Sequence, residues 1–322
     1  MSWNRSLRSI RNGLICLFLA PLIHSCGAST EPPLRIASNI WIGYEPLYLA
    51  RSLGQFSEET ISLVELTSAS EVLHAMRNGT IEGAALTLDE TLILLEDGFD
   101  LRVILILDYS NGADAILGQP NLSTLKDLKG KRVAVEYTAV GAIMLGTALQ
   151  LAGLTTEDIE IIHSPLDEHK KTFADVDAIV TFEPLRTQIL NDGAKLLFDS
   201  SQIPERIIDV VVVFEKTMRT HPKALRNLVQ GYFKARKYMT ENPEAAFVRL
   251  APRLGLTVDQ VKTAYEGITL TELSGNEALL KGSEPKLNSI AEDLATFMFE
   301  QNLLHRNVNT DFLGEGKFLR NE

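Results

Sequence analysis

Residues 101–118, LRVILILDYSNGADAILG, contain two apolar segments separated by a short polar break. The first segment, 101–110, is long and almost continuously apolar, which predicts a strand that is buried on both faces of a sheet. The second segment, 114–118, predicts another strand. We interpret the break at 108–112 as the point where the chain leaves one sheet and enters a second one.

Strands alternate with helices on both sides of this break. Before it, Pro46, Ser68 and Asp89 each mark the start of a helix that follows an apolar strand. After it, apolar segments again alternate with short helices, and a strand at 209–215 leads the chain back, with the return crossing near 209–213. The sequence therefore predicts an α/β protein of two lobes, with a cleft at the carboxyl ends of the strands.

The last third of the chain has a different pattern. Pro222 and Pro243 each stand at a position suited to helix entry, and Thr257 with Gln260 forms a capping-box pattern. We therefore expect successive helices from 222 to about 302, as a helical C-terminal tail on the α/β body.

The N-terminal segment has the features of an export signal. Three arginines precede the apolar run 13–23, which is too short to span a bilayer. Cys26 follows a small residue and precedes Gly27, a pattern that resembles a bacterial lipoprotein signal. We expect cleavage after residue 25 and acylation of Cys26; an ordinary secretory signal that contains a cysteine is the alternative.

Charge and cysteine content restrict the possible functions. Removing residues 1–25 deletes three arginines and no acids, so the formal charge moves from −11 to −14. Such a body would be repelled by nucleic acid. The mature chain would keep only Cys26, which excludes a disulfide within the chain and an enzyme with a catalytic or metal-binding thiolate.

Five segments, in register, resemble a known family: the periplasmic substrate-binding proteins of ABC importers for nitrate, sulfonate, taurine and thiamine pyrimidines. They are GYEPLYLAR at 43–51, DYSNGADAILG at 108–118, LKDLKGKRVAV at 125–135, VDAIVTFEP at 176–184 and SSQIPERIIDVVVV at 200–213. The resemblance implies a type II periplasmic-binding-protein fold with a hinge of crossing strands. From the two crossings we expect, after a linker at 26–33, the boundaries 34–108 with 210–322 for lobe 1, and 109–209 for lobe 2.

The resemblance also implies that ligand contacts come from the loops at 41–45, 87–89, 110–114, 137–141 and 181–183. The candidate ligand-binding residues are Trp41, Gly43, Tyr44, Glu45, Thr87, Ser110, Asn111, Asp114, Tyr137, Thr138, Gly141 and Glu183. No catalytic residue, metal ligand or cofactor is expected.

Several of these positions also have a structural interpretation. Trp41 and Tyr44 could cap the core, although two aromatic residues on one loop favour stacking on a flat ligand. Residues 110–112 could form only a hinge turn. Glu183 could be a helix-entry acid, and residues 138–141 could simply cap a helix.

The charges of these loops predict the ligand class. Five acids lie in or beside them, and no lysine or arginine does; the acids are Glu45, Asp89, Asp108, Asp114 and Glu183. Asp114 begins an apolar strand, where a carboxylate needs a partner. The stretch at 137–143 also differs from sulfonate-binding relatives, which tend to carry serine and histidine there. We therefore expect a solute with an amine, amidine or amino-pyrimidine group rather than nitrate or an alkanesulfonate.

We expect a monomeric, lipid-anchored protein in the periplasm or on the cell surface, which delivers its solute to ABC permease and ATPase subunits. Hydrolase, P-loop, metalloprotease and dinucleotide-binding motifs are absent from the sequence, which argues against an enzyme. The alternatives are a ligand sensor coupled to a membrane receptor, because both functions use one closed state, and, less favoured, a taurine, sulfonate or nitrate binder.

Overall fold

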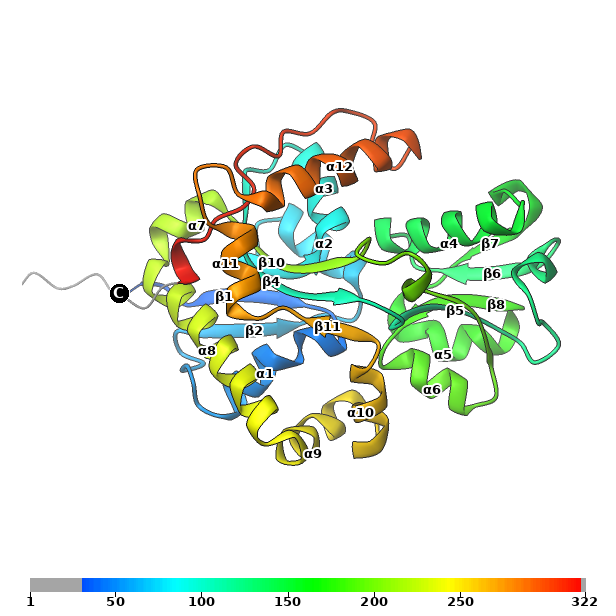
Figure 1. Ribbon diagram of the computed structural model, residues 1–322, viewed down its shortest axis with the longest axis horizontal. Helices are drawn as coiled ribbons and strands as arrows, with labels where there is room; N and C mark the ends of the chain where they lie inside the picture. Colours follow the sequence, from blue (N-terminus) through cyan, green and yellow to red (C-terminus); the bar gives the residue numbers. More distant parts are fainter. Residues whose placement is uncertain (1–30, 320–322) are drawn as a thin grey trace, which may run out of the picture. The chain divides into compact units, whose positions relative to one another are not determined.

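The computed structural model describes residues 31–319, whose helices and strands form two α/β lobes, each built around one sheet (Figure 1). The lipoprotein signal and Cys26 lie outside these residues. Within 31–319, no helix combines the length and the apolar character needed to cross a membrane.

The first lobe contains a six-stranded sheet in the order β11-β4-β10-β3-β1-β2. Strands β1, β2 and β3 are parallel to one another. Strand β10 lies between β3 and β4 and is antiparallel to both. The strands are β1 (Leu34–Ser38), β2 (Ile61–Glu65), β3 (Gly83–Thr87), β4 (Leu101–Ser110), β10 (Ile208–Phe214) and β11 (Ile268–Leu270). The helices between the early strands are α1 (Glu45–Ser52), α2 (Ala69–Arg77) and α3 (Leu88–Glu96).

The second lobe contains a five-stranded sheet in the order β7-β6-β8-β5-β9. Its strands are β5 (Asp114–Gly118), β6 (Arg132–Val135), β7 (Glu160–His163), β8 (Ala178–Phe182) and β9 (Lys195–Asp199). Its helices are α4 (Ala139–Ala152), α5 (His169–Thr172) and α6 (Leu185–Asn191). The two-lobed α/β fold predicted from the sequence is confirmed. The residue boundaries that we expect for the lobes stay a prediction.

The chain crosses between the sheets twice. The outward crossing joins β4 to β5 at 111–113, as predicted. The return crossing runs over 200–207, so its predicted position near 209–213 was wrong: β10 pairs with β3 and β4 along its whole length. Asp108 of β4 therefore lies directly opposite Asp209 of β10.

The outward crossing is a turn that is pinned by hydrogen bonds. Gly112 has a φ of 119°, which favours glycine, and its N–H donates to Ser200 Oγ at 2.7 Å. The Ser110 hydroxyl lies 2.7 Å from the same Ser200 oxygen, and the Asn111 N–H donates to the Gly267 carbonyl at 2.8 Å. Of the two interpretations of residues 110–112, this geometry favours the hinge turn.

The helical tail covers the first lobe: α8 packs against α1, and α12 packs against α3. Thr257 and Gln260 form the predicted capping box. One strand interrupts the helices, since β11 pairs with residues 108–110 of β4; three residues are too few to give a periodic signal. The helices are α7 (Glu215–Thr220), α8 (Pro222–Glu241), α9 (Pro243–Leu254), α10 (Val258–Tyr265), α11 (Leu273–Leu280) and α12 (Lys286–Glu300).

Asn276 of α11 fixes the middle of β4 through two backbone hydrogen bonds. Its Oδ1 accepts from the Ile106 N–H at 2.7 Å, and its Nδ2 donates to the Ile106 carbonyl at 3.0 Å. Both partners are fully buried. We predict that Asn276→Ala lowers the free energy of unfolding by about 2–3 kcal/mol, because a buried N–H and C=O lose their partner. Chemical denaturation measures this loss.

Asn191→Ala is the matched control, because Asn191 is an exposed asparagine at the end of α6. It should change the free energy of unfolding by no more than about 0.5 kcal/mol. Equal effects of the two substitutions would contradict the role given to Asn276.

Candidate binding site between the lobes

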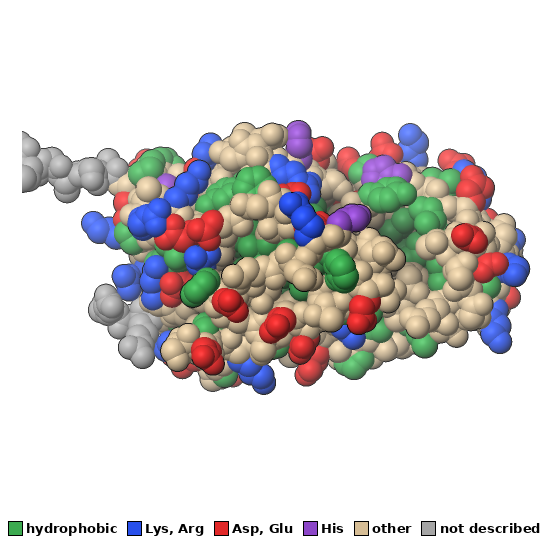
Figure 2. Space-filling view, turned by 90° about the horizontal axis from the view of Figure 1, so that it is seen from above, with side chains coloured by type: hydrophobic (Ala, Val, Ile, Leu, Met, Phe, Trp, Pro, Cys, Tyr) green, Lys and Arg blue, Asp and Glu red, His purple; other side chains and the backbone are tan. Residues whose placement is uncertain are grey.

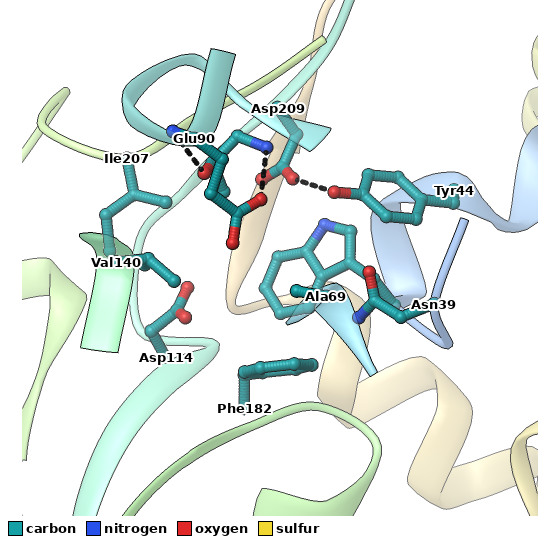
Figure 3. Close-up of a pocket in the computed structure, with 11 residues that line it drawn as sticks. Asn39, Tyr44, Ala69, Glu90, Asp114, Val140, Phe182, Ile207 and Asp209 are labelled. Atoms are coloured by element: carbon teal, nitrogen blue, oxygen red, sulfur yellow. Dashed lines mark hydrogen bonds between the residues drawn. The ribbon is translucent and has the colours of Figure 1, made fainter. Parts of the chain in front are cut away.

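A small cavity lies between the lobes and is lined by residues of both (Figure 3). Its volume is about 20 Å³, which is room for one water-sized group. A larger solute therefore requires the lobes to separate. The lining residues are Asn39, Trp41, Tyr44, Ala69, Thr87, Glu90, Asp114, Val140, Phe182, Ile207 and Asp209.

Three aromatic side chains form one part of the lining. Trp41 and Phe182, from different lobes, meet edge to face with ring centroids 5.6 Å apart. The Tyr44 hydroxyl donates to Asp209 Oδ1 at 2.6 Å. Trp41 and Tyr44 are only 4% and 3% exposed and also pack in the core. These two residues therefore belong to the core and also line the cavity.

Gly43 lets this aromatic loop approach β4. A Cβ added to Gly43 would lie 1.9 Å from Asp108 Oδ2 and 2.5 Å from Trp41 Nε1. The Trp41 Nε1–H donates to Asp108 Oδ2 at 3.3 Å. A side chain at position 43 would therefore break the contact between the indole and the carboxylate.

Three buried aspartates, Asp108, Asp114 and Asp209, form what we call the aspartate cluster. Burial, with the charge of Asp114, raises the pKa of Asp108 to about 8. Burial also raises the pKa of Asp114 to about 7, and burial with the charge of Asp108 raises that of Asp209 well above its ordinary value. Each has one carboxylate oxygen without a hydrogen-bond partner among the described residues.

No lysine or arginine of the described chain lines this cavity. Figure 3 shows Asp114 and Glu90 pointing into the space from different lobes, while Asp209 bonds to Tyr44. Unpaired buried carboxylates are costly when ionised. The cavity therefore offers carboxyl groups that would ionise against a cationic donor, which the described lining does not supply.

Glu90 is bound differently, because it closes the N-terminus of α3. Thr87 and Glu90 form a capping box, with the Thr87 N–H donating to Glu90 Oε2 at 3.1 Å. Burial, with the charge of Asp89, raises the pKa of Glu90 to about 8. We expected α3 to begin at Asp89, but its N-cap is Thr87. Thr87, a candidate ligand-binding residue, does line the cavity. The TxxE pattern of residues 87–90 is the sequence signal for its capping role.

Two acids used in the charge argument are already paired. Both oxygens of Glu45 accept from Arg253 Nε, at 2.9 and 3.0 Å. Glu183 accepts from the Thr187 hydroxyl at 2.8 Å and pairs with Arg186 at 3.1 Å. The structure does not bring Glu45 or Glu183 to the lining of the cavity. The loop residues alone could not reveal the pairing of Glu45, because Arg253 lies 208 residues away in the sequence.

A second cavity, of about 10 Å³, adjoins the first and shares Asp114, Val140 and Phe182 with it. Thr138 and Gly141 line it, and the Gly141 N–H donates to Thr138 Oγ1 at 3.3 Å as part of the cap of α4. The helix-cap interpretation of these two residues is therefore correct, and they also face the site.

His169 lines the second cavity and carries no charge there. Its Nε2–H donates to the Ser164 carbonyl at 3.1 Å, so its Nδ1 accepts from the Thr181 hydroxyl at 3.0 Å. Burial lowers the pKa of His169 to about 4. The imidazole therefore does not offset the carboxylates at neutral pH.

A groove of about 610 Å³ lies between α4 and the end of α12, outside these cavities. It shares Val135, Glu136 and Thr138 with the second cavity. Tyr137 lines this groove and is 73% exposed, with its ring 5.2 Å from that of His163. Figure 2 looks onto the face that carries α4 and α12, where apolar side chains gather in both lobes and charges of both signs are mixed.

The structure thus brings together Trp41, Tyr44, Thr87 and Asp114 in the first cavity. Gly43 lies next to the Trp41 indole and the Asp108 carboxylate. It leaves Asn111 exposed in the hinge turn. Val140 and Phe182 belong to two of the expected loops, at 137–141 and 181–183, but were not candidate residues. The lining residues outside the expected loops are Asn39, Ala69, Glu90, Ile207 and Asp209. Asp209 had a signal, since a carboxylate inside the apolar run IIDVVVV requires a partner.

The acids do not form a recognisable metal site. Among residues 31–319, no group of three or more His, Cys, Asp or Glu residues is placed to hold a metal ion.

The lobes, the hinge and the cavity between them define a two-lobed solute-binding protein. A model of the NMT1-like family matches residues 27–251, and the chain belongs to this family. It is homologous to taurine-binding and alkanesulfonate-binding periplasmic proteins of ABC importers, so the predicted family is confirmed.

One relative is the taurine-binding periplasmic protein of Escherichia coli (strain K12), 23% identical over 283 residues, which cover 82% of this chain and 87% of the relative. The alkanesulfonate-binding protein of Xanthomonas axonopodis pv. citri bound to MOPS has a TM-score of 0.73 at 20% identity, covering 88% and 98% of the two chains. A desulfurization enzyme shares the fold, with a TM-score of 0.64 at 17% identity and coverage of 89% and 97%. The fold alone therefore does not separate binding from catalysis.

The aspartate cluster predicts how stability depends on pH. Burial raises the folded-state pKa of Asp114 to about 7 and of Asp108 to about 8. The contribution of these protonated carboxyls to the stability of the fold is fully present below the ordinary pKa of aspartate. It is lost as the pH rises through the folded-state pKa values. We predict that the melting temperature of the ligand-free protein falls between about pH 5 and about pH 8.5.

Asp114→Asn should remove part of this pH dependence. At the alkaline end, the variant should lose less free energy of unfolding than the wild type, by on the order of 4 kcal/mol. The matched control is Asp293→Asn, an exposed aspartate of α12, which should keep the wild-type profile. A pH-independent wild type, or an unchanged profile in Asp114→Asn, would contradict the account.

Proposed function

We propose that this protein captures a small solute with a cationic nitrogen group, such as an amine, amidine or amino-pyrimidine, and delivers it to an ABC permease. The observation that carries the proposal is the aspartate cluster. Asp114 and Asp209 line the cavity, Asp108 lies opposite Asp209 in the sheet, and each has an oxygen without a partner in the described chain. A ligand N–H cation would supply the missing donor and the missing charge.

The aromatic lining supports the same ligand class. Trp41, Tyr44 and Phe182 surround the space next to Asp114 and Asp209. Aromatic faces attract cations, and the attraction is larger in sites without water. The hydrogen bond from Tyr44 to Asp209 leaves the second oxygen of that carboxylate for the solute.

The relatives that bind sulfonates do not transfer their ligand directly to this chain. A sulfonate or nitrate placed in the cavity would find no lysine or arginine in the described lining, and its charge would oppose the ionisation of Glu90, Asp114 and Asp209. The ammonium end of taurine fits these carboxylates, but its sulfonate does not. We therefore place simple alkanesulfonates and nitrate behind cationic solutes.

We further propose that the protein works as a monomeric binding protein rather than as an enzyme, in the periplasm or on the cell surface, together with permease and ATPase subunits. The relatives named as periplasmic binding proteins support this role. The N-terminal pattern supports a lipid anchor on Cys26, which lies outside the described residues.

The test measures the binding of a panel of small molecules to the mature protein, purified after the cell has processed it. The cationic probes are ethylamine, benzamidine and 4-aminopyrimidine; the anionic probes are ethanesulfonate and nitrate. We predict that at least one cationic probe raises the melting temperature by binding the native state and that the anions do not. Calorimetry of that probe should show binding about 10- to 100-fold weaker in Asp114→Asn and Asp209→Asn.

Asp293→Asn should bind the cationic probe like the wild type, because Asp293 is exposed on α12. A melting-temperature rise with nitrate or ethanesulfonate, and none with the cations, would refute the proposed solute class and leave the fold and family unaffected.

A further inference from the structure

The carboxylate of Glu136 crosses from the second lobe to the first. Glu136 follows β6, and its Oε1 accepts from the Ser70 N–H at 2.9 Å and from the Ser70 hydroxyl at 2.7 Å. Ser70 is the second residue of α2, whose N-cap is Ser68. Glu136 is only 4% exposed, and its Oε2 has no hydrogen-bond partner among the described residues.

The end of α2 that receives this carboxylate faces the binding site. Ala69, the first residue of α2, lines the first cavity, and Glu136 lines the second one. A helix N-terminus binds anions through its free N–H groups and the positive end of the helix dipole. The serine hydroxyl adds a second donor. A solute sulfonate or carboxylate would use the same two donors that Glu136 uses.

Glu90, an acid that lines the first cavity, binds a helix N-terminus in a different way. Glu90 closes the N-terminus of α3 from within its own helix, through the capping box with Thr87. Glu136 comes from a separate lobe, 66 residues away from Ser70 in the sequence. The end of α2 is therefore satisfied by Glu136 only while the two lobes are together.

We infer that Glu136 determines the specificity of the site: its carboxylate occupies the anion-binding end of α2 and so excludes solutes that carry an anionic group beside their cation. This inference rests on the proposed function for the cationic half of the solute. A zwitterion such as taurine could place its ammonium group at the aspartate cluster, but its sulfonate would compete with Glu136 for Ser70. Without Glu136, the same site would accept both ends.

The substitutions Glu136→Ala and Glu136→Ser test this directly, because neither side chain reaches Ser70. Glu136→Gln is the matched control, since its amide oxygen can still accept both hydrogen bonds without the negative charge. The probes are taurine and ethylamine, which differ by the sulfonate. Calorimetry and melting temperature are measured for each protein and probe, so that folding is checked in the same samples.

We expect Glu136→Ala and Glu136→Ser to bind taurine at least about tenfold more tightly than the wild type and Glu136→Gln do. Ethylamine affinity should change much less. Adding Ser70→Pro to Glu136→Ala removes both donors at a position in the first helical turn where proline is tolerated, and should abolish the gained taurine affinity. A residue that only holds the lobes together would not produce this pattern.

Two results would overturn the inference. Taurine affinity that stays at the wild-type level in both folded small-residue variants would show that Glu136 does not occupy a solute position. An equal gain in Glu136→Gln would show that charge repulsion, rather than occupation of the helix end, excludes the sulfonate. Either result leaves ethylamine binding by the wild type, and with it the proposed function, intact; conversely, a gain of taurine without wild-type ethylamine binding refutes only the proposed solute class.

Discussion

The juxtaposition of Asp108 and Asp209 is the constraint on which the rest of the site depends. The antiparallel pairing of β4 and β10 places these two carboxylates opposite each other at the end of the first sheet. Burial raises the pKa of both carboxyls; the charge of Asp114 raises that of Asp108 further, and the charge of Asp108 raises that of Asp209. Trp41 and Tyr44 each donate one hydrogen bond to the pair. The aromatic loop, the hinge strands and the charge of the cavity are therefore coupled through two side chains.

This arrangement of carboxylates lowers the stability of the empty protein when they ionise, but it would favour the binding of a cation. Burying carboxylates without counter-charges costs stability whenever they ionise. On the proposed function, a cationic solute would offset this cost only when the lobes enclose it, and the same residues would then couple binding to closure. Glu136 adds a second link between the lobes, since its hydrogen bonds to Ser70 form across the cleft.

Much of the fold could be predicted from the sequence, because its signals are local. The long strand β4, the parallel strands β1 and β3, and the capped helix α10 all follow from apolar patterns and helix-start residues. The three-residue strand β11 and the exact return crossing could not, since both depend on which strand pairs with which. The site was predicted less completely. The candidates Trp41, Tyr44, Thr87 and Asp114 line the cavity, and Phe182 lies in an expected loop. Asp209 reaches the cavity only through the tertiary arrangement. The pairing of Glu45 with Arg253 joins residues far apart in the chain.

The most direct test of the central claim is a count of the protons released when a cationic probe binds. Calorimetry at about pH 7 in two buffers with different ionisation enthalpies gives this number. If the aspartate cluster is partly protonated in the empty protein and ionises against the bound cation, binding must release protons and the measured heats must differ between the buffers. Tight binding of an amine with the same heat in both buffers, and so without proton release, would contradict the account.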